Sequence, residues 1–297
     1  MSSNYKINFK QLRQEGLKET FAAFERAMQA LQVDFYLIGA LARDTWFAQK
    51  GIRALGTKDI DLAIFVSDTG KYEELKQFLV KEEGFTPSSG NEYVLFDKKG
   101  QQIDLLPFGL IEIEGKKIVD SNGMAHTNIS GFKEVYEQAV EEVEFDDKYI
   151  FKVSTLAGVV ILKLIAYDDR PEMRSKDIQD IGAILNNYFE MESELIFEQH
   201  SDLFEKEIGN MIEVSARVIG REMLPILNRN PVLKERILSI LNNNIEHYNE
   251  NRLTIILTGI LHFSPGSIED TVRVLTEIIM GIHDKEAISS NKNKDHF

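Results

Sequence analysis

The chain has 297 residues, of which 43% are hydrophobic and 28% are charged, so it is long enough for two modest domains or one large one. Its 34 basic and 48 acidic residues give a net charge of −14, which argues against a duplex-DNA-binding protein because such binding rests on many phosphate contacts. The absence of cysteine excludes disulfides, thiolate nucleophiles and cysteine-ligated zinc. A polar beginning and the lack of a long apolar run predict a cytoplasmic protein without a membrane segment.

Hydrophobic periodicity in the first half of the chain predicts a mixture of helices and strands. Leu17, Phe21, Phe24 and Met28 recur at helical spacing, whereas the short apolar run 34–40 is typical of a buried strand. We predict helices over 10–31, 40–50, 71–82 and 132–139, strands over 34–40, 59–66 and 148–153, and hairpins over 91–108 and 110–119.

After residue 154 the strand patterns end and helical patterns dominate to about residue 283. Asn230-Pro231 marks a joint between helices, and Ser267 with Asp270 resembles a capping box. We therefore predict an α+β domain over 1–153 and an all-helical domain over 154–297, with a flexible tail from about residue 285.

Three aspartates are the candidates for chemistry. Asp59 and Asp61 alternate with Ile60 and Leu62 in the predicted strand 59–66, so both carboxylates point to the face away from the core, about 7 Å apart. Asp104 lies in a later strand between two apolar residues, and it joins the pair if that strand lies beside 59–66. Such a cluster suits Mg²⁺, which prefers hard oxygen ligands and substrate phosphates. The alternative is a solvated strand face with no ligand.

A small-residue turn precedes the predicted helix 40–50. Gly39 and Ala40 follow a buried strand and open this helix, so their backbone N–H groups and the positive end of the helix dipole suit a phosphate. Together with the aspartates, this turn predicts a site for a nucleotide and magnesium.

A charged residue interrupts the most apolar helix of the chain. Lys163 lies among Val159, Leu162 and Leu164, where an ammonium group is costly unless an anion meets it. Arg170 follows two helical turns later. Asp177 and Asp180 share one face of the next helix. These residues either form an internal salt-bridge network or place Lys163 toward a triphosphate at the domain junction, and the two interpretations are compatible.

The ordered motifs resemble a known family. Gly39-Ala40, then Thr57-x-Asp59-x-Asp61, then Asp104 in a later strand, is similar to the nucleotidyltransferases of the polymerase-β superfamily. The lysine-bearing helix and the segment Lys176-Asp177-Ile178-Gln179-Asp180 are most similar to the AbiEii/AbiGii toxin-like members. The resemblance covers about residues 34–185. It departs from the family at Ala40, where a second glycine or a serine is common.

The resemblance implies a nucleotidyltransferase-type mixed sheet flanked by helices, with Mg²⁺ as cofactor and an NTP as substrate. It implies metal ligands at Asp59, Asp61 and Asp104, with catalytic roles for these three and for Lys163. The residues that it implies for nucleotide binding are Gly39, Ala40, Arg43, Thr57, Lys58, Arg170, Lys176, Asp177 and Asp180.

The expected reaction is transfer of NMP to an acceptor hydroxyl, of an RNA or tRNA end or of a protein. The resemblance also suggests the toxin of a toxin–antitoxin pair, with a cognate antitoxin as partner. Three alternatives stay open: a binding module of the same fold without activity, a metal-dependent phosphohydrolase, and a transferase acting on an aminoglycoside-like small molecule.

Overall fold

The computed structural model describes residues 5–14, 16–109, 117–119, 126–205, 208–263 and 266–284. The chain divides into two compact units, Met1–Asp169 and Arg170–Phe297. This division lies one helix later than the predicted boundary at 153/154. The reason is that helix α5 (Leu156–Asp169) packs within the first unit, where it contacts helix α2 (Gly39–Gln49) and strand β10 (Tyr149–Ser154).

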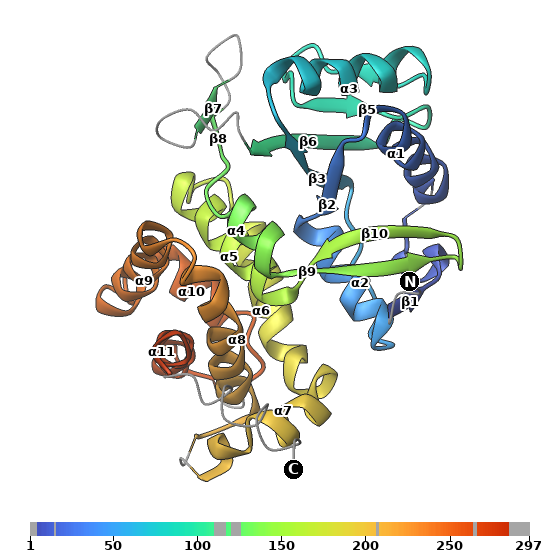
Figure 1. The fold of residues 1–297 in the computed structure, drawn as a ribbon. Coiled ribbons are helices and arrows are strands. Elements are labelled where there is room, and N and C mark those ends of the chain that lie inside the picture. The colour runs from blue at the N-terminus through green and yellow to red at the C-terminus, as the bar shows by residue number, and fades with distance from the viewer. Residues whose placement is uncertain are drawn as a thin grey trace, which may run out of the picture. The chain divides into compact units, whose positions relative to one another are not determined.

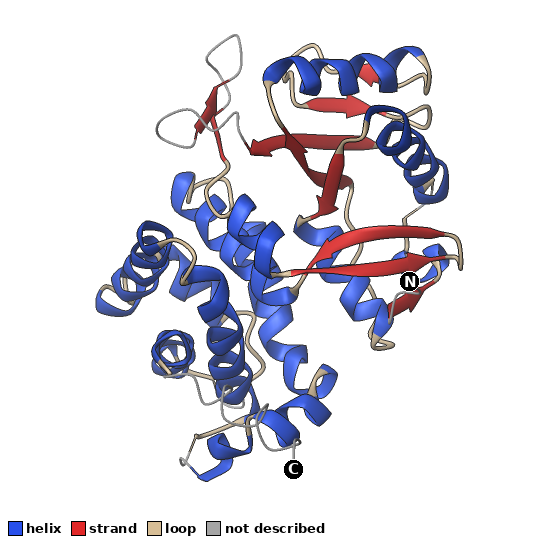
Figure 2. Ribbon diagram, viewed as in Figure 1, coloured by secondary structure: helices blue, strands red, loops and turns tan. Residues whose placement is uncertain are grey.

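Within the described residues, the first unit contains an eight-stranded mixed sheet (Figure 2). Strand β3 lies near its middle, antiparallel to β2 on one side and parallel to β6 on the other. The order across the sheet is β1 (Tyr5–Ile7), β9 (Val140–Phe145), β10, β2 (Asp34–Leu37), β3 (Asp59–Val66), β6 (Gln102–Gly109), β5 (Val94–Phe96) and β4 (Thr86–Pro87).

Helices cover both faces of this sheet. Phe24 of α1 (Leu17–Leu31) packs edge-on against Phe35 of β2, with 5.4 Å between ring centroids. Tyr136 of α4 (Phe132–Gln138) packs on Tyr36, the next residue of β2, at 5.8 Å. Because successive strand residues point to opposite faces, α1 and α4 lie on opposite sides of the sheet. Helix α3 (Thr69–Lys81) packs beside α1 (Figure 1).

Most of the elements predicted in the first half are present. The predicted strand 59–66 coincides with β3, and the predicted hairpin 91–108 corresponds to the antiparallel pair β5–β6. The strand predicted over 34–40 ends at Leu37, because α2 begins at Gly39. The helix predicted over 10–31 is interrupted: a 3-10 turn (Phe9–Leu12) precedes α1, and Gly16 between them has a φ of 84°.

Other segments differ from the prediction or lie outside it. Strands β1 and β9 were not predicted. The predicted hairpin 110–119 falls mostly outside the described residues; its last part is β7 (Lys117–Val119), which pairs with β8 (His126–Asn128). The predicted flexible tail from about residue 285 also lies outside the described residues.

The second unit is helical throughout its described residues. Its longest helices are α6 (Ser175–Met191), α8 (Met211–Leu227), α9 (Pro231–Glu246) and α11 (Ile268–His283), with the shorter α7 (Ser193–Gln199), a 3-10 turn η2 (Ser201–Glu205) and α10 (Arg252–Thr258) between them. At the predicted joint Asn230 caps α9, and the predicted Ser267–Asp270 capping box begins α11. The predicted class, an α+β domain followed by helices, is confirmed.

Two glycines let α8 and α11 cross at close range. A Cβ atom at Gly220 would lie 2.2 Å from the carbonyl oxygen of Ile278, and one at Gly281 would lie 2.2 Å from that of Arg217. Both distances are far below van der Waals contact, so the crossing requires glycine in each helix. No helix of the described residues is long and apolar enough to span a membrane.

Candidate active site

Two carboxylates lie opposite each other on β3 and β6. The parallel register pairs Asp61 with Asp104 and Asp59 with Gln102. All four side chains are half-buried, whereas Ile60 between the two β3 aspartates is completely buried. The prediction that the strand of Asp104 lies beside 59–66 is confirmed. Because residues paired in register share a face and the side chains alternate, Asp59, Asp61 and Asp104 lie on one face of the sheet.

The turn at Gly39 lies against this carboxylate pair. Gly39 has a φ of 66°, and a Cβ atom built on it would lie 2.2 Å from Oδ2 of Asp61. The backbone N–H of the preceding residue, Ile38, donates to the carbonyl oxygen of Asp61 over 3.1 Å. Glycine is therefore required here for two independent reasons, its positive φ and the space that the Asp61 carboxylate takes. The predicted phosphate-binding turn and the predicted metal ligand are in contact.

The start of α2 has no side-chain cap. Its N-cap residue, Ile38, has no polar side chain to accept from the first-turn N–H groups. Those groups carry the partial positive charge of the helix N-terminus. Ala40, the second residue of α2, is half-buried. Gly39 and Ala40 thus lie where sequence reasoning expects phosphate binding, beside Asp61.

Two glutamines at the beginning of β6, Gln102 in the strand and Gln101 just before it, hold this end of the sheet, and sequence reasoning missed both. Gln102, opposite Asp59, donates from Nε2 to Oδ1 of Asp104 over 2.8 Å. Gln101 donates from Nε2 to the carbonyl oxygen of Lys58, the residue before β3. Gln102 thereby orients Asp104, and Gln101 fixes the entry into β3. Gln101 and Gln102 stand three and two residues before Asp104. This spacing indicates their contacts only once the register of β3 and β6 is known.

A buried ion pair fixes the loop that leads into β3. Asp44 accepts from the backbone N–H of Gly56 (2.7 Å) and from Nη2 of Arg43 (2.6 Å). Arg43 is 1% exposed, so its guanidinium lies in the protein interior. Arg43 thus has a structural role at α2, and its contact with the nucleotide stays a prediction. Asp44, which sequence reasoning missed, is the residue that ties α2 to the loop.

The remaining predicted residues of the loop lie at the beginning of β3. The Thr57 hydroxyl accepts from the backbone N–H of Asp59 over 3.3 Å and lies 3.2 Å from its carbonyl oxygen. Thr57 is half-buried and Lys58 is exposed. Both therefore adjoin the first aspartate of the cluster.

The predicted basic and acidic residues of the helical segment are divided between the two units. Lys163 belongs to α5 in the first unit and is 6% exposed, as its apolar neighbours predict. Arg170, Lys176, Asp177 and Asp180 belong to the second unit. There Asp177 is buried and pairs with Arg174 over 3.6 Å.

The carboxylates of this site are compatible with magnesium if a nucleotide supplies further ligands. Among the described residues, no group of three or more His, Cys, Asp or Glu side chains is arranged to hold a metal ion by itself. Mg²⁺, however, is usually bound by one or two carboxylates together with waters and substrate phosphates. The opposed pair Asp61–Asp104 supplies hard oxygen donors, and the Gly39 turn beside it supplies N–H groups for phosphate. The residues present therefore fit a magnesium ion that is bound together with a nucleotide.

Comparisons with known proteins give structural likenesses only. No family model and no curated protein matches the chain. An antigenic nucleotidyltransferase-like protein from Paracoccidioides brasiliensis is 15% identical, covering 68% of this chain and 94% of that chain, with a TM-score of 0.40. The Thermotoga maritima CCA-adding enzyme complexed with tRNA is 13% identical, covering 91% of this chain and 70% of that chain, with a TM-score of 0.33.

A further likeness is to the antibiotic-resistance factor ANT(2″)-Ia, at 12% identity, covering 54% of this chain and 77% of that chain, with a TM-score of 0.32. At these identities and TM-scores the likenesses assign neither an activity nor a substrate to this chain.

Proposed function

We propose that the chain is a magnesium-dependent nucleotidyltransferase that transfers NMP from an NTP to an acceptor hydroxyl. One observation carries the proposal: Asp61 and Asp104 are opposed on parallel strands, and Gly39 at the start of α2 lies against Asp61. Carboxylates for a cation and free N–H groups for an anion thus adjoin each other, as a metal-bound triphosphate requires.

In this proposal Asp59, Asp61 and Asp104 would hold Mg²⁺ together with water and oxygens of the nucleotide phosphates. When bound, the ion neutralises the charge of the triphosphate and of the transition state. The backbone N–H groups of Gly39 and Ala40 bind phosphate oxygens. Gln102 keeps Asp104 in one orientation through its hydrogen bond to Oδ1.

The reaction is an in-line displacement at the α-phosphorus. Asp104 accepts the proton of the acceptor hydroxyl, whose oxygen forms the new bond to phosphorus. The bond from the α-phosphorus to the bridging oxygen breaks, and pyrophosphate leaves. Lys163 stays a predicted catalytic residue. The residues that stay predictions for nucleotide binding are Arg43, Thr57, Lys58, Arg170, Lys176, Asp177 and Asp180.

The acceptor that we propose is an RNA end, such as that of tRNA, or a protein hydroxyl. A role as the toxin of a pair with a cognate antitoxin, and a cytoplasmic location, likewise stay predictions. The acidic net charge of −14 implies that any RNA contact is local.

The test is transfer of label from α-³²P-NTPs, offered one at a time with Mg²⁺, to total tRNA or to protein. Transfer of α-label with release of pyrophosphate supports the proposal, and Asp61→Asn should abolish it. Release of label as free nucleotide with no labelled acceptor would indicate a phosphohydrolase. Labelling of an aminoglycoside alone would indicate the small-molecule transferase. Binding of NTP without turnover in all of these assays would indicate a binding module.

A further inference from the structure

Three phenylalanines of the helical unit form a surface patch. This aromatic patch consists of Phe189 in α6, Phe197 in α7 and Phe204 in η2 (Figure 1, labels α6 and α7). Phe197 and Phe204 stack with 4.9 Å between centroids and 14° between planes, and Phe189 meets both edge-on at 5.9 and 6.4 Å. Phe197 is 57% exposed and Phe204 is 46% exposed.

The exposure of this patch is unusual because its members are contiguous. Single exposed apolar side chains, such as Val232 at 72%, are ordinary features of a protein surface. A stacked pair of large aromatic rings instead presents one continuous apolar area, and aromatic side chains are enriched at protein interfaces. Covering the patch with a partner is therefore favourable, because it removes this apolar area from water.

The segment that carries the aromatic patch is strongly acidic. Residues 189–205 contain six acidic residues and no lysine or arginine. Four of the acids, Glu190, Glu194, Glu198 and Glu205, are exposed. A fifth, Asp202, is paired with Arg221 over 2.6 Å. The exposed charges of this segment are thus anionic.

We propose that the aromatic patch binds a basic, apolar segment of a partner protein. Apolar side chains of that segment would cover the stacked rings, while its lysines and arginines would meet the surrounding glutamates and the ring faces. The same charges argue against nucleic acid, whose phosphates the glutamates repel. They also argue against a second copy joined patch to patch, because that contact opposes acid to acid.

The test uses a synthetic 18-residue helical peptide of leucine and lysine, labelled with fluorescein, and measures its binding to the full chain by anisotropy. The Phe197→Ser/Phe204→Ser variant should bind at least ten-fold more weakly than the unmodified chain. Glu194→Gln/Glu198→Gln should also weaken binding and reduce its dependence on salt. The matched control Val232→Ser removes an even more exposed apolar side chain of the same unit and should change nothing.

Three outcomes would overturn the proposal. Equal affinity of the phenylalanine variant and the unmodified chain would show that the peptide is attracted only by net charge. Equal binding of a leucine–glutamate peptide would remove the charge argument. Sedimentation of the unmodified chain as a dimer that the phenylalanine variant abolishes would make a second copy the occupant. Thermal unfolding followed by circular dichroism checks that each variant is folded.

Discussion

The sheet unit and the helical unit use glycine and charge for different purposes. In the sheet unit, Gly39 makes room for the carboxylate of Asp61; in the helical unit, Gly220 and Gly281 make room for backbone, and all three would bring a Cβ within 2.2 Å of an oxygen. The distance is the same at all three glycines, but a Cβ at Gly39 would meet a side chain, whereas one at Gly220 or Gly281 would meet backbone. A glycine facing a polar side chain that sits on a strand face indicates a site, whereas a glycine facing a neighbouring helix indicates packing.

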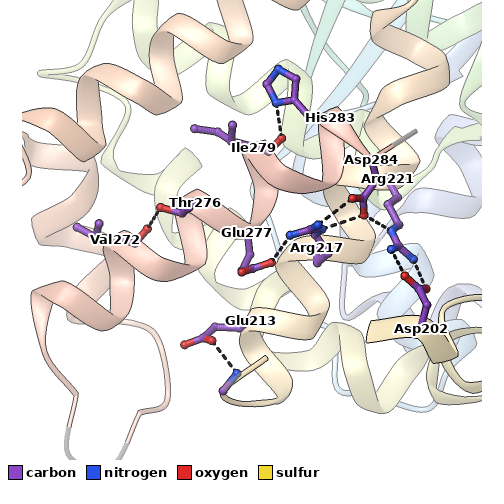
Figure 3. A network of polar contacts seen from close by, with 11 residues as sticks. Asp202, Glu213, Arg217, Arg221, Val272, Thr276, Glu277, Ile279, His283 and Asp284 are labelled. Carbon is purple, nitrogen blue, oxygen red and sulfur yellow. Dashed lines mark hydrogen bonds and ion pairs between the residues drawn. The ribbon is translucent and has the colours of Figure 1, made fainter. Parts of the chain in front are cut away.

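Charged residues show the same contrast. In the helical unit two buried arginines of α8 are fully paired: Arg217 bonds Glu277 and Asp284, and Arg221 bonds Asp284 and Asp202 (Figure 3). These bonds tie α8 to the end of α11 and to η2. In the sheet unit the aspartates of β3 and β6 stand half-buried on one face of the sheet instead. Carboxylates that bridge elements through arginine stabilise the fold, whereas Asp61 and Asp104 face each other from neighbouring strands.

The largest effect that we expect is on the opposed carboxylates. Asp61→Asn should lower nucleotidyl transfer by about 10³-fold or more, because one metal ligand is lost from a charge-stabilised transition state. The melting temperature should stay within a few degrees of that of the unmodified chain. Initial rates with α-labelled NTP and thermal unfolding measure the two quantities.

The matched control for this change is Asp147→Asn, which removes an exposed carboxylate of the same unit paired with Lys6. It should leave the rate unchanged. Wild-type activity in Asp61→Asn would show that the contrast between the two kinds of carboxylate is wrong.

The next effect tests the packing glycines. Gly281→Ala places a Cβ against the backbone of α8 and should lower the free energy of unfolding by about 3 kcal/mol, the upper range for overpacking. Gly259→Ala, where a Cβ would meet nothing closer than 3.5 Å, should cost far less. Urea denaturation measures both. If the two variants were equally stable, close helix crossing would not explain Gly281.

A smaller effect is expected at the glycine of the site. Gly39→Ala and Gly51→Ala both put a side chain at positive φ, 66° and 75°, so they share the conformational cost. Only Gly39→Ala also displaces the Asp61 carboxylate, because nothing lies within 4 Å of a Cβ at Gly51. We expect NTP affinity to fall about ten-fold in Gly39→Ala, or about 1.4 kcal/mol.

Calorimetric titration of Mg²⁺–NTP into both variants tests this difference. Similar affinities in Gly39→Ala and in Gly51→Ala would show that the Gly39 turn does not bind the nucleotide. A loss confined to Gly39→Ala would locate the phosphates beside Asp61.

Local patterns were sufficient to predict the central strands. The alternation of Ile60 and Leu62 with Asp59 and Asp61 gave both the extent of β3 and the face of its carboxylates. Strand β9 was missed because its glutamates, at 141, 142 and 144, lower the apolar signal of a strand whose Val143 and Phe145 are nevertheless buried.

Contacts between residues that are far apart in the chain could not be predicted from the sequence. The bond of Asp44 to the backbone N–H of Gly56 joins residues that no periodic pattern relates, and the pairing of Gln102 with Asp104 has meaning only beside Asp59. The same holds for Gly220, which looks like a helix-weakening residue until α11 is seen to cross it.

The smallest effect per step of the experiment, one pH unit, concerns the carboxyl group of Glu222 in the helical unit, which is bonded to a tyrosine rather than to an arginine. Tyr188 of α6 donates to Glu222 of α8 over 2.6 Å. Burial raises the pKa of Glu222 to about 7, from an ordinary value of 4.5. The folded state therefore binds more protons than the unfolded state between these values, so the free energy of unfolding should fall as the pH rises from about 4.5 to about 7.

Glu222→Gln removes this titration. Its stability relative to the unmodified chain should rise with pH, on the order of 1 kcal/mol per pH unit, and level off above about pH 7. Urea denaturation at pH 5, 6, 7 and 8 measures it, and Glu235→Gln, at an exposed position of α9, should show no such trend. Tyr188→Phe sharpens the test: because the hydroxyl bond favours the ionised carboxylate and lowers the pKa of Glu222, its loss should move the fall in stability to higher pH. An unchanged midpoint in Tyr188→Phe would mean that the tyrosine does not set this titration.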